Sequence, residues 1–191
     1  AYYLADEQPR FVDIQDFNYL MIDGVSAPEN QLFNHSIQSI YAVAYALKFH
    51  YKALEKDFVV PKMECQWWVE GSNPFEQTPR DQWHWNIMIP LPDYVSKRDF
   101  ETSKVNAEQN KQSDTIKDVV FKPLAQGFCV QVLHNGSYEA EAPSISKILD
   151  FVSSQDYEIN GYHTEIYLTD PSRTAVEKLR TILRYPVRSK V

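Results

Sequence analysis

The apolar positions between residues 37 and 54 recur at intervals of three and four residues. They are Ile37, Ile40, Tyr41, Ala44, Leu47, Tyr51 and Leu54. This spacing places the apolar side chains on one side of an α-helix, so the pattern predicts an amphipathic helix over residues 36–55. Asn30 and Asn34 precede it, and either residue can serve as its N-cap.

Three apolar runs in the same half of the chain have the lengths of β-strands. They cover residues 19–24, 63–70 and 83–89, and the last two end at Gly71 and Pro90. Glycine and proline interrupt strands, because proline has no N–H to donate to a neighbouring strand. The first half is therefore predicted to run strand, helix, strand, strand.

The second half repeats this order of elements. Strands are predicted at residues 127–134, 162–168 and 181–187, and a short helix at residues 144–152 follows the first of them. Two such units in tandem indicate an α+β fold of duplicated strand-helix-strand-strand modules, related by a pseudo-twofold axis and with a central ligand cleft. The repeat is one of predicted elements, not of sequence identity.

The stretch between the two halves is polar. Residues 94–112 have the sparse apolar positions of a largely solvated helix, and residues 106–114 are rich in amides and charges. This stretch resembles a linker, yet each half is too small to bury a good core alone. We therefore predict a single domain over residues 1–191, with an irregular segment at residues 1–17.

Residues 163–171, His-Thr-Glu-Ile-Tyr-Leu-Thr-Asp-Pro, place a carboxylate in the middle of a predicted strand. Alternation along the strand puts Thr164 and Ile166 on one face and His163, Glu165 and Tyr167 on the other. A single strand carboxylate is most often a solvent-exposed residue. A carboxylate between an imidazole and a phenol can also form the floor of an aromatic pocket, and the rest of the chain must decide between the two.

Charge and composition exclude several classes of function. The net charge is −7 and there is no basic cluster, whereas nucleic-acid surfaces need clustered Lys and Arg. No apolar run approaches the roughly 20 residues of a membrane span, and no signal peptide is recognisable. Cys65 and Cys129 lie in separate apolar runs, as buried thiols of a cytoplasmic protein do. We expect no nucleic-acid partner, no membrane association and a cytoplasmic location.

Aromatic residues are abundant, with 12 Tyr, 10 Phe and 4 Trp. Trp67 and Trp68 are consecutive in one predicted strand, so their side chains point to opposite faces and one of them must leave the core side. For each tryptophan, a core position and a place in a ligand pocket are both compatible with the sequence.

Other catalytic constellations are weaker. His84, His134 and His163 could meet in space, but scattered histidines are mostly structural. The five glycines include no phosphate-binding loop. The sequence therefore predicts no metal site and no cofactor.

Five stretches, spread in order over nearly the whole chain, carry a family resemblance. They are residues 19–24, 40–49, 64–68, 131–138 and 163–171. In these stretches the sequence resembles the GyrI-like small-molecule-binding domains. The resemblance implies a duplicated strand-helix-strand-strand fold with a ligand cleft and a key acidic residue in that cleft, which corresponds to Glu165.

The resemblance also suggests an activity. Some stand-alone members of this family hydrolyse cyclopropane-bearing, DNA-alkylating natural products as a protective function. Two positions depart from the family pattern: Thr164 replaces a second histidine, and Cys65-Gln66 replace an expected glycine-leucine before the tryptophans. Both changes can reshape the pocket and therefore its substrate range.

The residues support two functions of different classes. A strained electrophilic ring needs a positioned water and a base, and Glu165 in an aromatic pocket suits the base. Trp67, Trp68, Tyr138, Tyr167 and His163 are the predicted ligand-binding residues. The same groups would also bind and sequester a hydrophobic cation without chemistry. A third role, inhibition of a protein partner as by the family's namesake, needs an interaction surface that the sequence does not reveal.

Overall fold

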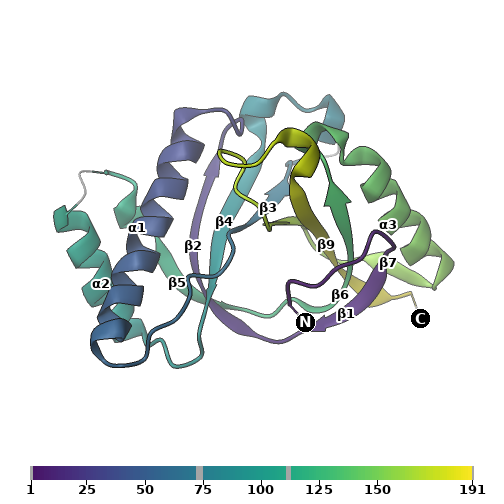
Figure 1. Ribbon diagram of the computed structural model, residues 1–191. Helices are drawn as coiled ribbons and strands as arrows, with labels where there is room; N and C mark the ends of the chain where they lie inside the picture. Colours follow the sequence, from purple (N-terminus) through teal and green to yellow (C-terminus); the bar gives the residue numbers. More distant parts are fainter. Residues whose placement is uncertain (1, 72–74, 111–112, 191) are drawn as a thin grey trace. The chain divides into compact units, whose positions relative to one another are not determined.

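The computed structural model describes residues 2–71, 75–110 and 113–190 (Figure 1). The chain divides into two compact units. Unit 1 combines the N-terminal residues Ala1–Asp16 with Ala125–Val191, and unit 2 is Phe17–Leu124. Both units are α+β, as predicted.

Unit 2 is an antiparallel sheet with two helices. Its elements are β2 (Phe17–Val25), α1 (Gln31–Ala53), β3 (Glu64–Trp68), β4 (His84–Leu91), α2 (Lys97–Asn110) and β5 (Val120–Leu124). The strands lie in the order β3-β4-β2-β5, and each neighbouring pair is antiparallel. Helix α1 packs on β2 and β4, and α2 packs on α1.

Unit 1 has the same plan. Its elements are β1 (Arg10–Ile14), β6 (Gly127–Asn135), α3 (Ala142–Ser154), β7 (Tyr157–Ile159), β8 (His163–Tyr167) and β9 (Arg180–Ser189). The strands follow the order β1-β6-β9-β8, and β7 pairs with β9. Helix α3 packs on β6 and β9, and this contact contains the core residues Val130, Val132, Ile148, Val152, Leu183 and Val187.

The predicted order strand, helix, strand, strand is therefore present in each unit. It corresponds to β2-α1-β3-β4 in unit 2 and to β6-α3-β8-β9 in unit 1. In unit 2 the strand after the helix, β3, begins the strand order, and the strand before the helix, β2, lies two positions from it. In unit 1 the corresponding strands β8 and β6 are also two positions apart, with β8 at the end of the order. The duplication of one ancestral module and its pseudo-twofold axis remain predictions.

Helix α1 begins at a predicted N-cap. The side-chain oxygen of Asn30 accepts the backbone N–H of Leu32 at 2.9 Å, and the helix starts at Gln31, earlier than the predicted residue 36. Ile40, Val43, Ala44 and Leu47 are fully buried. The predicted apolar stripe is confirmed at its centre, where it covers the sheet.

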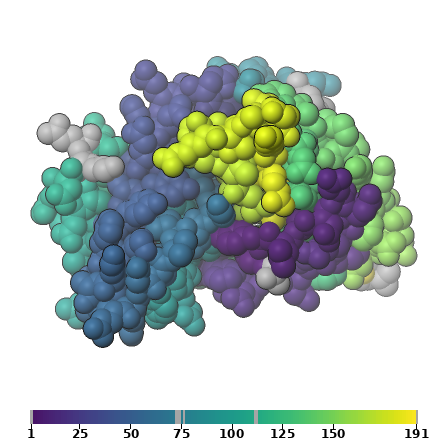
Figure 2. All heavy atoms as spheres, viewed as in Figure 1, coloured from purple at the N-terminus to yellow at the C-terminus, as the bar shows by residue number. Residues whose placement is uncertain are grey.

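At the margins of that stripe the side chains are less buried than predicted. Tyr41 is half-buried, Leu54 is 55% exposed, and Tyr45 and Phe49 are exposed. The rings of Tyr41, Tyr45 and Phe49 follow one another along the helix, with neighbouring centroids 6.3 Å apart. The blue-violet spheres of α1 reach the surface on the side shown in Figure 2. One step along a helix turns a side chain by about 100°, so neighbours of the central row already face outward.

Strand β4 does not end at Pro90 as predicted but continues to Leu91. Pro90 pairs with Tyr19 of β2, whereas the pairing of β4 with β3 stops at Met88. At Pro90, β4 therefore has one neighbouring strand, and the N–H that proline lacks costs no bond on the open side.

Three short strands were not predicted from the sequence. They are β1, within the stretch predicted to be irregular, and β5 and β7. β1 and β5 are the last strands of their sheet orders, next to β6 and β2, and β5 contains Pro123. Short edge strands have weak alternation, and they form because an adjacent strand offers free hydrogen-bonding groups. Residues 72–74 of one predicted turn and residues 111–112 of the predicted 94–112 helix lie outside the described residues.

Gly24 provides the first testable prediction. It lies opposite Trp85 in the β2–β4 register, and an added Cβ would overlap the Trp85 indole. That indole is fully buried and donates its N–H to Ser26 Oγ at 3.0 Å, so it has little freedom to move. We expect Gly24→Ala to lower the free energy of unfolding by about 1–3 kcal/mol in urea titrations. The adjacent exposed Asp23→Ala is the control, and equal stability of the two variants would contradict the explanation.

Candidate functional site

Strand β8 has the predicted alternation. Thr164 and Ile166 are buried at 1% and 0% exposure, whereas His163, Glu165 and Tyr167 are intermediate. Glu165 pairs with Leu183, a member of the core that α3 covers. Glu165 therefore projects from the face of the unit 1 sheet on which α3 packs, and it does not lie on an open surface.

His163 lies between two carboxylates. Its Nε2 atom is 3.3 Å from Oε1 of Glu165 and 3.8 Å from Oε2 of Glu141. The side chains of Glu141, His163 and Glu165 are only 6%, 14% and 13% exposed. We call these three residues the Glu–His–Glu cluster. They are held by the start of α3 and by one face of β8.

The cluster shifts the protonation of its members. Burial raises the pKa of Glu141 to about 7, against the opposing effect of His163. Burial alone would lower the pKa of His163, but the hydrogen-bonding carboxylates of Glu141 and Glu165 outweigh it and raise that pKa to about 9. At neutral pH, His163 is thus an imidazolium, and Glu141 is poised between its two protonation states.

Two buried atoms of the cluster have no hydrogen-bond partner among the described residues. They are Oε1 of Glu141 and Nδ1 of His163. Buried polar atoms nearly always have partners, so an unsatisfied pair in one cluster indicates a place for water or a ligand.

Two predicted phenols accompany the cluster. The rings of Tyr138 and Tyr167 meet edge to face, with centroids 5.7 Å apart. Burial, together with the negative charges of Glu165 and Glu141, raises the pKa of Tyr138 to about 12. Tyr138 therefore keeps its proton and can act as a hydrogen-bond donor. A third ring, that of Tyr185, lies 5.0 Å from the His163 ring.

Glu141 was missed by the sequence analysis. It is the residue before α3, with Pro143 next to the helix start, and an acidic residue there is ordinarily explained by the helix dipole. Its side chain makes no capping hydrogen bond and is buried. The available signal was a second glutamate close after Tyr138, but only the packing of α3 brings it to His163.

The cluster also has the composition of a metal site. Glu141, His163 and Glu165 each offer one ligand atom, and these atoms lie within 4.8 Å of one another. One imidazole and two carboxylates suit a divalent transition metal. However, an imidazolium between two carboxylates accounts for the same distances without an ion. His84, His134 and His163, which the sequence analysis considered and set aside as structural, do not form a group of this kind in the described part of the chain.

Comparison with known proteins places the chain in a family. The profile of the GyrI-like small molecule binding domain matches residues 7–188, nearly the whole chain. The chain belongs to this family. Among proteins of curated function, none matches it closely enough to count as a relative.

Solved structures resemble this GyrI-like domain over almost its full length. A conserved protein of Listeria innocua, described as uncharacterized, is 31% identical with a TM-score of 0.91. Two structures described as hydrolases from the same organism are 30% and 28% identical, with TM-scores of 0.89 and 0.87. Each alignment covers 98% of this chain and 95% of the other.

The two predicted tryptophans belong to unit 2 of the GyrI-like domain. Trp67 is 6% exposed and packs against Phe33 of α1, with ring centroids 5.2 Å apart. Trp68 is half-buried and stacks on His84 at 5.3 Å. The opposite orientation of the two side chains is thus confirmed. Their place in a pocket with Glu165 remains a prediction, whereas His163, Tyr138 and Tyr167 share unit 1 with Glu165.

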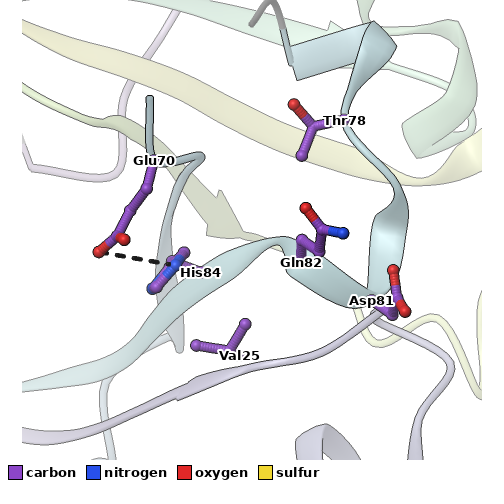
Figure 3. A pocket seen from close by; sticks show the side chains of 6 residues that line it. All are labelled: Val25, Glu70, Thr78, Asp81, Gln82 and His84. Carbon is purple, nitrogen blue, oxygen red and sulfur yellow. Dashed lines mark ion pairs between the residues drawn. The ribbon is translucent and has the colours of Figure 1, made fainter. Parts of the chain in front are cut away.

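Unit 2 of the GyrI-like domain contains a separate polar cavity of about 270 Å³. Its lining residues, shown in Figure 3, are Val25, Glu70, Thr78, Asp81, Gln82 and His84. The Glu70 carboxylate points toward the neighbouring His84 ring, with an oxygen 3.8 Å from Nε2. None of the predicted site residues lines this cavity.

Among the described helices, none has both the length and the apolar character to cross a membrane.

Proposed function

We propose that this GyrI-like domain is a hydrolase that opens a strained, electrophilic ring, such as that of a cyclopropane-bearing xenobiotic, by adding water at the Glu–His–Glu cluster. The observation that carries this proposal is the pair of buried carboxylates on either side of one imidazole. Pairs of titratable groups with differing environments supply the acid and the base of one reaction. The hydrolase descriptions of two similar structures support the same class of reaction.

Glu165 acts as the base in this proposal. Its Oε1 faces the imidazolium of His163, and no described residue bonds Oε2, which is left to accept a proton from water. The water oxygen forms a bond to a ring carbon while a carbon–carbon bond of the ring breaks. The electron pair of that bond moves to an electron-accepting group conjugated with the ring, such as a carbonyl oxygen.

Glu141 and Tyr138 act on the negative charge that develops. Glu141, with its pKa raised to about 7, donates a proton to the oxygen that receives the electron pair. Tyr138 remains protonated and donates a hydrogen bond to the same oxygen. The steps together add one water molecule: its hydroxyl group bonds to the ring carbon, the accepting oxygen gains a proton, and the proton taken up by Glu165 then replaces the one that Glu141 has donated. Tyr138 and Tyr167 provide ring surfaces for an aromatic substrate.

Product analysis tests the proposal. The protein is incubated with a cyclopropane-bearing aromatic compound in water enriched in the heavy oxygen isotope, and the masses of the products are measured by mass spectrometry. We expect ring-opened product that contains one heavy oxygen. A parallel reaction with a chelator should give the same yield, whereas loss of product with the chelator and its return with a divalent metal would assign the cluster to a metal.

The pH dependence of turnover tests the role of Glu141. The acid must be protonated, and a group with a raised pKa is protonated below that pKa, so turnover is expected to fall as pH rises through about 7. In Glu141→Gln the side chain no longer titrates, and the low remaining turnover should lose this descending limb. A limb that persists unchanged in Glu141→Gln would show that another group is the acid.

A non-catalytic binder is the second candidate, favoured by the aromatic ring pair beside two carboxylates. Such a module would sequester a hydrophobic cation through ring faces and counter-charge. In the labelled-water experiment it would retain the intact compound and form no product.

A further inference from the structure

The segment that carries Tyr138 and Glu141 is attached to β6 through one buried side chain. His134, near the end of β6, is 5% exposed. Its Nε2 lies 2.9 Å from the carbonyl oxygen of Ser137, and its Nδ1 lies 3.1 Å from Oγ of Ser144. The imidazole therefore contacts the residue before Tyr138 and a residue in the first turn of α3.

These contacts define the roles of both ring nitrogens. A carbonyl oxygen can only accept, so Nε2 carries the proton and donates to Ser137. In the neutral ring, Nδ1 then accepts the hydroxyl proton of Ser144. The Ser137 carbonyl also accepts the N–H of Ala140, so the short turn at residues 138–140 and the imidazole share one acceptor.

The backbone around this attachment makes local hydrogen bonds, and Gly136 donates its N–H to the carbonyl oxygen of Leu179 at 3.0 Å. Gly136 has a φ of +122°, which side-chain-bearing residues rarely adopt. Helix α3 has no side-chain N-cap bond, because Glu141, at the N-cap position, makes none. The His134 bonds thus join the two ends of the segment 137–144.

The sheet register places this attachment beside the site. His134 of β6 and Tyr167 of β8 both lie opposite Thr181 of β9, so the three residues form one row across the sheet. Tyr167 contacts Tyr138 in turn. A movement of the segment 137–144 would therefore displace both Tyr138 and Glu141 relative to β8.

We propose that His134 is a positioning residue that holds Tyr138 and Glu141 over His163 and Glu165 by fastening both ends of the segment 137–144 to β6. The effect of His134 on turnover rests on the proposed function. Its effect on the position of Glu141 beside His163 does not. Residues that orient catalytic groups in this way, without touching substrate, commonly contribute a factor of roughly 10–100.

The test uses three variants of the full chain and a fourth held in reserve. His134→Phe fills the space but removes both hydrogen bonds. His134→Gln keeps one donor and one acceptor at a similar separation. Val152→Ala removes core volume from α3, away from the segment, and serves as the control for lost stability. Ser144→Ala removes one bond only and replaces His134→Phe if that variant does not fold.

The first measurement is an NMR titration of His163, which needs no substrate. In the wild type, the carboxylates that face Nε2 keep the pKa of His163 near 9. If His134→Phe withdraws Glu141, we expect the titration midpoint to shift downward by roughly one pH unit. His134→Gln should restore much of the shift, and Val152→Ala should show none. An unchanged midpoint in His134→Phe would overturn the proposal.

The second measurement is turnover of the cyclopropane-bearing compound. We expect kcat to fall roughly 10–100-fold in His134→Phe with a smaller change in KM, and to recover in His134→Gln. An equal loss in His134→Phe and Val152→Ala would make His134 merely structural. Absence of turnover in the wild type would refute the proposed function, and the NMR titration would still decide the role of His134.

Discussion

Glu165→Gln is expected to lower turnover of a cyclopropane-bearing substrate by roughly 10²–10⁴-fold, the usual contribution of a positioned general base. The amide keeps the size of the side chain and a hydrogen-bonding oxygen but cannot take the proton of the attacking water. Single-turnover kinetics measure the effect. Fluorescence titration with a neutral aromatic ligand should show nearly unchanged affinity, because the ring contacts remain.

A matched control separates this effect from a loss of negative charge. Glu177→Gln removes the charge of an exposed glutamate in the same unit and should leave turnover unchanged. If Glu165→Gln and the wild type turn over equally, Glu165 is not the base. If there is no turnover to lose and Glu165→Gln instead weakens the binding of a hydrophobic cation, the sequestering module explains the site, because its counter-charge has been removed.

The free energy of unfolding is expected to fall by about 3 kcal/mol as pH rises from 6.5 through about 9. The physical reason is the imidazolium of His163, whose pKa is raised from 6.5 to about 9 by the facing carboxylates of Glu141 and Glu165, against the effect of burial. A histidine with a raised pKa in the folded state contributes its full stabilisation below the unfolded pKa and loses it as pH passes the folded pKa.

Urea unfolding at several pH values measures this dependence. Glu141, with a pKa raised from 4.5 to about 7, contributes the same sign of slope at lower pH, so the range above pH 7 isolates His163. Because His163 lowers the pKa of Glu141, His163→Gln is introduced into the Glu141→Gln background, where the slope above pH 7 should largely disappear. His35→Gln, at an exposed position of α1, should keep it. A His163→Gln variant with the wild-type slope would show that His163 is not the titrating group.

Together, these variants assign separate roles to the members of one cluster. Glu165→Gln reports on the base, the pH profile of Glu141→Gln on the acid, and the stability profile of His163→Gln on the imidazolium between them. The assignments are independent, because kinetics measure the first two and equilibrium unfolding measures the third.

Local periodicity determined much of the fold from the sequence alone. The centre of α1 is buried where the three- and four-residue spacing predicts, because each helical residue turns by a nearly constant angle. The alternation of β8 places Thr164 and Ile166 on one face of the sheet and Glu165 on the other for a similar reason. Both patterns depend only on neighbours within the same element, so the chain displays them before any tertiary contact is known.

The tertiary structure decided the features that depend on distant neighbours. Strand β4 passes through Pro90 because β3 no longer pairs with it there, and β1 forms because β6 offers it an edge. The same holds for the site. Glu141 belongs to the start of α3, and only the packing of that helix brings its carboxylate to His163.

Glu165 was predictable as a strand carboxylate next to a histidine and a tyrosine, but the charge state of its surroundings was not. Burial is the main cause of the raised pKa values of Glu141 and Tyr138, whereas the pKa of His163 is raised by the facing carboxylates of Glu141 and Glu165 against the effect of burial. Sequence spacing determines which face of a strand or helix a side chain occupies. The burial and the partners of that side chain, and therefore its chemistry, depend on what the folded chain packs against that face.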